Sequence, residues 1–162
     1  MTDLPYRPCA GVMLLNRDGQ VFVGQRLDST LEAWQMPQGG IDPGEAPRDT
    51  AVRELGEETG IAREHLELIA EAPVELVYDL PDEMIGKVWG GKYRGQRQRW
   101  FLFRFTGQDS DVNIETAHPE FRAWRWADPA ELTTLIVPFK RRLYEEVLDA
   151  FSAHLDSATI HR

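Results

Sequence analysis

Cysteine is nearly absent from this chain of 162 residues, which contains only Cys9. A single cysteine cannot form an internal disulfide, and such sparse use suits a reducing, cytoplasmic environment. Because Cys9 opens an apolar run, we expect a buried structural thiol and not a nucleophile. No apolar run approaches the ~20 residues needed to cross a bilayer, and the start of the chain lacks the apolar segment of a signal peptide. We therefore expect a cytoplasmic protein without a membrane partner.

Other missing features exclude whole classes of enzyme. There is no Walker A glycine loop, no Ser-His-Asp set and no zinc-type spacing of Cys and His. Internal repeats and low-complexity segments are absent too. A chain of this length is expected to form one domain, residues 1–162, with enough residues for a substantial core. The histidines show no ligand spacing, and we expect them on the surface; they are His65, His118, His154 and His161.

Acidic residues are missing from one segment although the chain as a whole is acidic. The formal net charge is −9, which argues against a general nucleic-acid binder, and we expect no DNA partner. Residues 84–108 contain no Asp or Glu, yet six of the chain's 18 Lys and Arg lie there. They are Lys87, Lys92, Arg94, Arg97, Arg99 and Arg104. A local basic patch on an acidic protein predicts an enzyme that acts on a short phosphate substrate.

One helix is marked by the residues at its two ends. Pro47 suits a first helical position, and Gly60 falls where a glycine commonly follows the last turn. Between them, Ala51, Val52 and Leu55 form an apolar stripe that would face a core. The pattern predicts a helix from Pro47 to the residue before Gly60.

Another face of this helix carries Glu54, Glu57 and Glu58. Like charges one turn apart repel by about 0.2–0.5 kcal/mol per pair, and Glu57 and Glu58 also lie at the negative end of the helix dipole. A locally unfavourable sequence usually serves a function. Carboxylates on one rigid face are the ligands that a divalent cation such as Mg²⁺ requires. The alternative is an ordinary solvated acidic face.

The remaining pattern predicts strands and a second helix. Helix Pro138–Phe151 carries an apolar stripe of Leu143, Val147 and Phe151. A long loop is expected at Pro81–Gly95. Strands mixed with two separate helices predict a sheet between helices. The expected strands are Cys9–Leu15, Val21–Gln25, one or two within Glu67–Tyr78, Gln98–Phe105 and Phe121–Trp126, and Trp34, Trp100, Trp124 and Trp126 are expected in packing.

Residues 39–61 resemble the Nudix box, G-x5-E-x7-R-E-U-x-E-E-x-G-U with U aliphatic, at every fixed position. The matching residues are Gly39, Glu45, Arg53, Glu54, Leu55, Glu57, Glu58, Gly60 and Ile61. The resemblance implies the α/β Nudix fold, an α/β/α sandwich with a mixed central sheet. It also implies a structural ion pair between Arg53 and Glu45 that holds the preceding loop on the helix.

Motifs outside the box resemble one bacterial group of this family, the RNA pyrophosphohydrolases, also described as dinucleoside polyphosphate hydrolases. The resemblance implies a hydrolase that removes pyrophosphate from the triphosphorylated 5′ end of RNA, with a role in mRNA decay. Two alternatives stay open: asymmetric hydrolysis of diadenosine tetraphosphate to ATP and AMP, and a catalytically silent nucleotide sensor. Protein partners are not readable from the sequence. The motifs are Tyr6–Pro8, Trp34–Gly40, Gly95–Phe101, Pro119–Phe121, Trp124–Trp126 and Pro138–Arg141.

The resemblance also assigns candidate site residues. The metal ligands for Mg²⁺, or for Mn²⁺ or another divalent ion, would be Gly39, Glu54, Glu57, Glu58 and Glu120, and these four glutamates are the candidate catalytic residues. Glu57 and Glu120 stay alternatives for the general base, although a lone loop glutamate such as Glu120 is ordinarily just solvated. The candidate substrate-binding residues are Arg7, Arg26, Tyr78, Gln96, Arg99, Phe139 and Lys140.

Three of these assignments have structural alternatives. Tyr78 and Phe139 would stack on a base, worth about 1–3 kcal/mol per base, and would then be partly exposed. Phe139 would otherwise be a core residue. Gln96 and Arg99 would bind phosphate, or else belong to an edge strand protected by its charges.

Overall fold

The computed structural model describes residues 3–29 and 31–160, with side chains as far as Leu155. His161, which we expected on the surface, lies outside the described residues. The helices are α1 (Pro47–Thr59), α2 (Leu132–Leu135) and α3 (Arg141–Ile160). The strands are β1 (Tyr6–Leu15), β2 (Val21–Arg26), β3 (Gln38–Gly40), β4 (Leu66–Glu71), β5 (Leu76–Asp79), β6 (Gly95–Phe105) and β7 (Phe121–Ala127).

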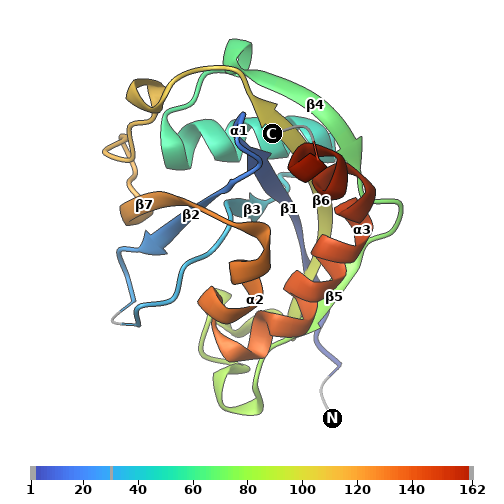
Figure 1. Ribbon diagram of the computed structural model, residues 1–162. Coiled ribbons are helices and arrows are strands. Elements are labelled where there is room, and N and C mark those ends of the chain that lie inside the picture. Colours follow the sequence, from blue (N-terminus) through green and yellow to red (C-terminus); the bar gives the residue numbers. More distant parts are fainter. Residues whose placement is uncertain (1–2, 30, 161–162) are drawn as a thin grey trace.

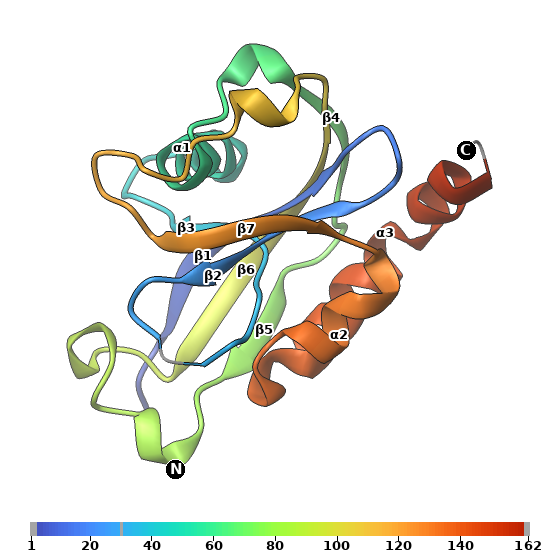
Figure 2. The same ribbon diagram turned by 60° about the vertical axis from the view of Figure 1, so that its left-hand side comes forward.

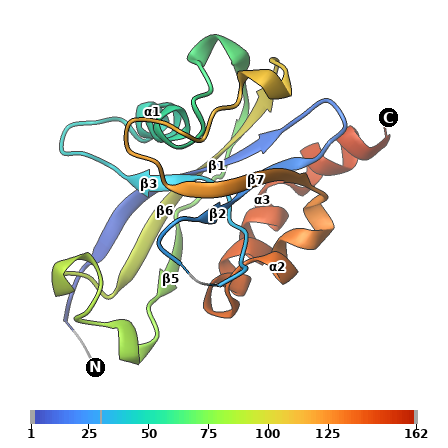
Figure 3. The same cartoon turned by 90° about the vertical axis from the view of Figure 1, so that its left-hand side faces the viewer.

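A mixed seven-stranded sheet forms the centre of the described chain (Figure 1). The strand order is β4-β6-β1-β2-β7, with β3 paired to β1 and β5 paired to β6. Strands β1 and β6 run parallel, and the other pairs are antiparallel. Helix α1 covers one face of the sheet, and α2 and α3 cover the other (Figure 2, Figure 3). The predicted sheet between helices is confirmed.

Strand β6 contributes to both cores because its alternate residues point to opposite faces of the sheet. Trp100 and Leu102 pack in the core that includes α3, while Phe101 and Phe103 pack in the core that includes α1. A strand that is apolar on both faces is typical of a sheet covered on both sides. Because β6 pairs with β1, β4 and β5, the alternative that this segment is an edge strand is wrong.

Helix α1 has the predicted bounds. Pro47 occupies its first turn, and Gly60 follows its end with a φ of 70° in the left-handed region that favours glycine. A β-carbon at Gly60 would also lie 2.7 Å from the carbonyl oxygen of Asn113. Ala51 and Leu55 are fully buried, so the predicted apolar stripe does face a core. This packing fixes which face of α1 carries the glutamates.

The other elements largely follow the prediction. The segment Glu67–Tyr78 holds nearly all of β4 and β5. The predicted loop at residues 81–95 contains only short 3₁₀ turns as far as Arg94, and its last residue, Gly95, begins β6. The last helix begins at Arg141, after a 3₁₀ turn over the first predicted residues Pro138–Lys140, and it extends beyond its predicted end to Ile160. Its apolar stripe is buried. Cys9 is buried as predicted, and burial raises the pKa of its thiol to about 11. Within the described residues, no helix has the length and apolar character needed to cross a membrane.

The structure also shows where the tryptophans and histidines lie. Trp100 is buried, and Trp124 stacks on Phe22 with ring centroids 5.4 Å apart. Trp126 contacts the same ring edge-on. His118 and His154 are exposed, whereas His65 is half-buried against Phe105.

Candidate active site

A cleft of about 760 Å³ lies where α1, β3 and the loop before β6 meet the 3₁₀ turn Pro138–Lys140 that precedes α3. Residues from distant parts of the chain line it, because the parallel pairing of β1 with β6 places Arg7 opposite Gln96. Nearly all of the predicted site residues lie here. They are Arg7, Arg26, Gly39, Glu54, Glu57, Glu58, Tyr78, Gln96, Glu120, Phe139 and Lys140.

The glutamates of α1 enter the cleft at different depths. Glu58 is buried, with 3% of its surface exposed, whereas the side chain of Glu57 is 53% exposed. Burial raises the pKa of Glu58 well above its usual range, and the negative charges of Glu54 and Glu120 add to this effect. Its buried Oε2 has no hydrogen-bond partner among the described residues. A buried carboxylate oxygen without a donor is a strong candidate for a cation ligand.

Arg53 holds the loop before α1 against the helix. Its Nε donates to Oε2 of Glu45 at 2.8 Å, and its Nη2 donates to the carbonyl oxygen of Gly40 at 3.1 Å. The Thr50 hydroxyl also donates to Glu45, and these contacts lower the pKa of Glu45 to about 2, with Arg53 contributing most. The predicted ion pair between Arg53 and Glu45 is therefore present. It fixes the loop that follows Gly40.

Gly39 brings the backbone of β3 against the carboxylate of Glu54. A β-carbon at this position would lie only 2.1 Å from Cδ of Glu54, so any side chain would displace that carboxylate. Burial raises the pKa of Glu54, although the charge of Arg53 opposes this. Glycine lets the backbone come close to a neighbouring group, and metal and phosphate sites often use it for this purpose.

The carboxylates suit a hard divalent cation by chemistry, but arginines hold three of them. Arg53 Nη1 donates to Glu54 at 3.0 Å and to Glu57 at 3.2 Å, and Arg26 lies 3.7 Å from Glu120. As the described side chains stand, no three acidic, His or Cys groups converge closely enough to hold a metal ion. All four predicted glutamates line the cleft, and their role as metal ligands stays a prediction. Like charges repel, and the two arginines provide the opposite charge instead.

An aromatic and basic wall faces these carboxylates. The rings of Tyr78 and Phe139 are 6.0 Å apart, and Nζ of Lys140 lies 5.1 Å from the centre of the Tyr78 ring. Burial lowers the pKa of Lys140 to about 8, helped by the positive charge of Arg26. Phe139 is half-buried, as its predicted role requires, but Tyr78 is only 6% exposed. The expectation that Tyr78 is partly exposed is wrong because Phe139 and Lys140 pack against its ring.

Gln96 and Arg99 do not lie together. Gln96 is buried and accepts a hydrogen bond from Nε2 of Gln98 at 2.6 Å, and Gln98 in turn accepts one from Nε1 of Trp100 at 2.7 Å. Arg99 points to the opposite face of β6, since alternate residues of a strand point in opposite directions. There it forms an ion pair with Glu71, and it does not line the cleft. We leave Arg99 out of the proposed site.

Several cleft residues were not predicted as site residues, and three of them have polar or aromatic groups at the site. Trp89 lines the cleft with a φ of 51°, and its ring lies 5.6 Å from the Arg7 guanidinium. Gln35 and Gln38 also line it, and each has a buried amide atom without a partner among the described residues. The sequence contained one indication of Gln35 and Gln38, because both lie in the motif Trp34–Gly40 that leads into the Nudix box. No local pattern singles out Trp89.

Comparisons with known proteins agree with this geometry. The model of the NUDIX domain matches residues 5–147. A protein of Sphingopyxis alaskensis named RNA pyrophosphohydrolase is 66% identical over 148 residues, which cover 91% of this chain and 94% of that protein. A protein of the same name from Cereibacter sphaeroides is 60% identical over 152 residues, covering 94% of each chain.

Solved structures show the same fold. The Ap4A hydrolase of C. elegans in a binary complex has a TM-score of 0.68 at 21% identity, covering 93% of this chain and 98% of that one. The dihydroneopterin triphosphate pyrophosphohydrolase of E. coli has a TM-score of 0.66 at 22% identity, covering 88% and 96%. This chain belongs to the Nudix family, and its predicted α/β fold is confirmed. Nudix hydrolases generally use divalent metal ions.

Proposed function

We propose that this protein removes pyrophosphate from the triphosphorylated 5′ end of RNA and leaves a monophosphate. One observation carries the proposal: a single cleft joins the glutamates of α1 to the cationic side chains of Arg7, Arg26 and Lys140 and to the half-buried ring of Phe139. The cations suit phosphate oxygens, and the ring suits a base. The name shared by the relatives of 58–66% identity supports this choice of substrate.

The carboxylates of the cleft have two proposed roles, metal binding and proton transfer. Glu54, Glu57, Glu58 and Glu120, with Gly39, would hold a divalent cation, for which we propose Mg²⁺ with Mn²⁺ as an alternative. When bound, the cation supplies neutralisation of the polyphosphate charge and Lewis-acid activation of water.

Either Glu57 or Glu120 takes the proton from the attacking water. Both side chains are about half exposed, at 53% and 47%, so water reaches each of them. Arg7 and Arg26 bind the phosphate oxygens. A catalytically silent nucleotide sensor would not need this set of carboxylates.

A second candidate activity is the asymmetric hydrolysis of diadenosine tetraphosphate to ATP and AMP. A second cavity beside the cleft, described below, favours it. Incubating the protein with triphosphorylated RNA and diadenosine tetraphosphate side by side, and comparing the two kcat/KM values, tests the choice. We expect RNA to have the higher value.

One domain across residues 1–162 and a cytoplasmic location stay predictions.

Replacing Phe139 with Ala is expected to raise KM for RNA roughly tenfold and to change kcat much less, because stacking binds the ground state and the transition state alike. Phe139 is half-buried, so the loss of stability should be smaller than the ~3–5 kcal/mol of a core truncation. Michaelis curves and thermal melts measure both effects. As a control, Phe151→Ala removes a fully buried ring from α3 and should lower the melting temperature sharply. An unchanged KM with an equally large melting shift in Phe139→Ala would contradict the stacking role.

Substrate binding is expected to weaken as the pH rises through about 8. The pKa of Lys140 is lowered to about 8 in the folded protein from a usual value of 10.5, so between these values the folded protein has lost a positive charge that the unfolded chain keeps. KM for RNA should therefore rise roughly tenfold from about pH 7 to about pH 9.5. Between the folded pKa of about 8 and the usual value of 10.5, the unfolded chain binds more protons at Lys140 than the folded protein does. Lys140 therefore makes the folding stability rise with pH in this interval.

Lys140→Arg is the matched control, since a guanidinium stays charged throughout this range. Its KM should change little with pH. If wild type and Lys140→Arg gave the same KM profile, the ammonium group of Lys140 would not contact the substrate.

A further inference from the structure

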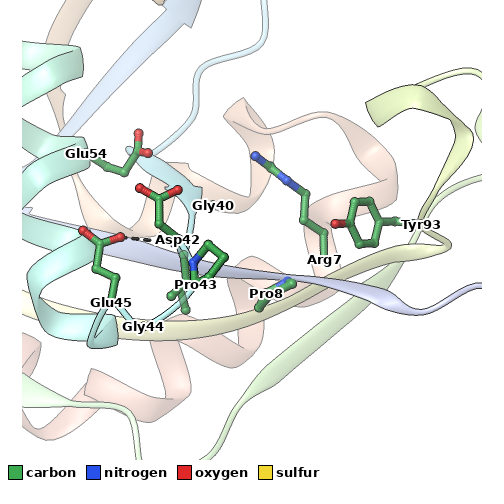
Figure 4. Close-up of a pocket in the computed structure, with 10 residues that line it drawn as sticks. Arg7, Pro8, Gly40, Asp42, Pro43, Gly44, Glu45, Glu54 and Tyr93 are labelled. Atoms are coloured by element: carbon green, nitrogen blue, oxygen red, sulfur yellow. Dashed lines mark hydrogen bonds between the residues drawn. The ribbon is translucent and has the colours of Figure 1, made fainter.

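A second cavity of about 490 Å³ adjoins the cleft (Figure 4). The two spaces share Arg7, Gly40 and Glu54 in their walls. The glycine at residue 40 leaves room for Arg7 in its present position, since a β-carbon there would lie 2.7 Å from Nη2 of Arg7. In Figure 4, Arg7 and Tyr93 lie on one side of the cavity and the carboxylates of Asp42, Glu45 and Glu54 on the other.

The loop at residues 81–95 supplies one aromatic ring to each space. Trp89 lines the cleft and Tyr93 lines the second cavity, with their ring centroids 6.4 Å apart. Tyr93 is half-buried, so part of its side chain is accessible from the cavity. Pro43, from the loop before α1, adds apolar surface to the cavity. An accessible aromatic side chain next to an apolar one suits a nucleobase.

The charge of the cavity limits what it can hold. The cavity is lined by three carboxylates and the Arg7 guanidinium, and Arg53 pairs with the same three carboxylates. With both guanidinium groups counted, a free phosphate group would still meet more negative than positive charge. Arg53 pairs with Glu45 at 2.8 Å and its Nη2 also lies 3.4 Å from Asp42, whose side chain is nevertheless 70% exposed. A nucleoside carries no charge, and its ribose hydroxyls can donate hydrogen bonds to a carboxylate such as Asp42.

We propose that the second cavity binds the nucleoside at the far end of a dinucleoside polyphosphate. Tyr93 stacks on its base, Asp42 accepts a hydrogen bond from its ribose, and Arg7 contacts the phosphates where the two spaces meet. The inference rests on the proposed function, because it requires the polyphosphate to lie across the carboxylates of α1. It assigns to this chain a recognition site for the part of the substrate that a triphosphorylated RNA lacks.

A pair of substrates that differ only in the far nucleoside tests this assignment. Diadenosine tetraphosphate and adenosine 5′-tetraphosphate carry the same phosphate chain, and wild type should have the higher kcat/KM on the first. In Tyr93→Ala, the ratio of the two kcat/KM values should fall roughly tenfold, through KM. Tyr93→Phe keeps the ring and should keep the ratio. Asp42→Asn, at an exposed position, should lower the ratio without a change in melting temperature.

The outcomes separate this inference from the proposed function. A ratio that stays constant in both Tyr93→Ala and Asp42→Asn would overturn the inference, whether the two rates fall together or do not change. Wild-type protein that leaves triphosphorylated RNA intact would instead refute the proposed function. Thermal melts of each variant show whether the loop at residues 81–95 still folds.

Discussion

Glu57→Gln should lower kcat by roughly 10²–10⁴-fold and leave the melting temperature nearly unchanged. Glu57 lies in the cleft with its side chain 53% exposed, and its carboxylate pairs with Arg53 at 3.2 Å. An ion pair this exposed contributes only about 0–1 kcal/mol to stability. Removing one charge from the crowded face of α1 also relieves repulsion, which offsets part of that loss. Steady-state kinetics and a thermal melt on the same preparation test both statements.

Glu64→Gln is the matched control for this variant. Glu64 is also exposed but lies in the short turn after α1, outside the residues that line the cleft, and its loss should leave kcat unchanged. Wild type in excess EDTA should behave like Glu57→Gln. Full turnover by Glu57→Gln, or by wild type in EDTA, would refute the assignment of the α1 carboxylates to a metal-dependent reaction.

Gly39→Ala should lower kcat by roughly 10²-fold or more, because a β-carbon at this position displaces the carboxylate of Glu54. The new atom would lie 2.1 Å from Cδ and 2.3 Å from Oε2 of Glu54. The clash is with the end of a flexible side chain, so Glu54 can rotate away and the chain should still fold. Gly39 pairs with Ala10 inside the sheet, which limits any movement of the backbone.

Gly56→Ala provides the comparison within the same motif. Its β-carbon would meet only the carbonyl oxygen of Ile61 at 3.6 Å, an ordinary contact. Alanine within a helix is more stable than glycine by about 0.5–1 kcal/mol, so this variant should melt at a higher temperature with wild-type kcat. Wild-type kcat in Gly39→Ala would mean that the reaction does not need Glu54 in its present position.

Local signals in the sequence were sufficient for α1 and for the centre of the sheet. Pro47 and Gly60 mark the ends of α1 through backbone geometry that depends on neighbouring residues only. The two apolar faces of β6 reflect its burial on both sides, which is why Phe101 and Trp100 both belong to a core. The Nudix box itself is a contiguous motif, so its residues could be named without knowledge of the fold.

The far wall of the cleft could not be predicted in the same way. It depends on the pairing of β5 with β6, which places Tyr78 opposite Gln96, and on the 3₁₀ turn before α3, which brings Lys140 over the Tyr78 ring. Pairing of this kind is set by the whole sheet, and a shift of one residue would turn every side chain to the other face. That is also why Arg99, although it lies in a matching motif, points away from the cleft.

The central claim is tested most directly by the products formed from an RNA with a 5′ triphosphate. With Mg²⁺ present, the protein should convert this end to a monophosphate and release pyrophosphate, and Glu57→Gln should release almost none in the same time. An RNA whose 5′ triphosphate stays intact at protein concentrations that hydrolyse diadenosine tetraphosphate would contradict the claim.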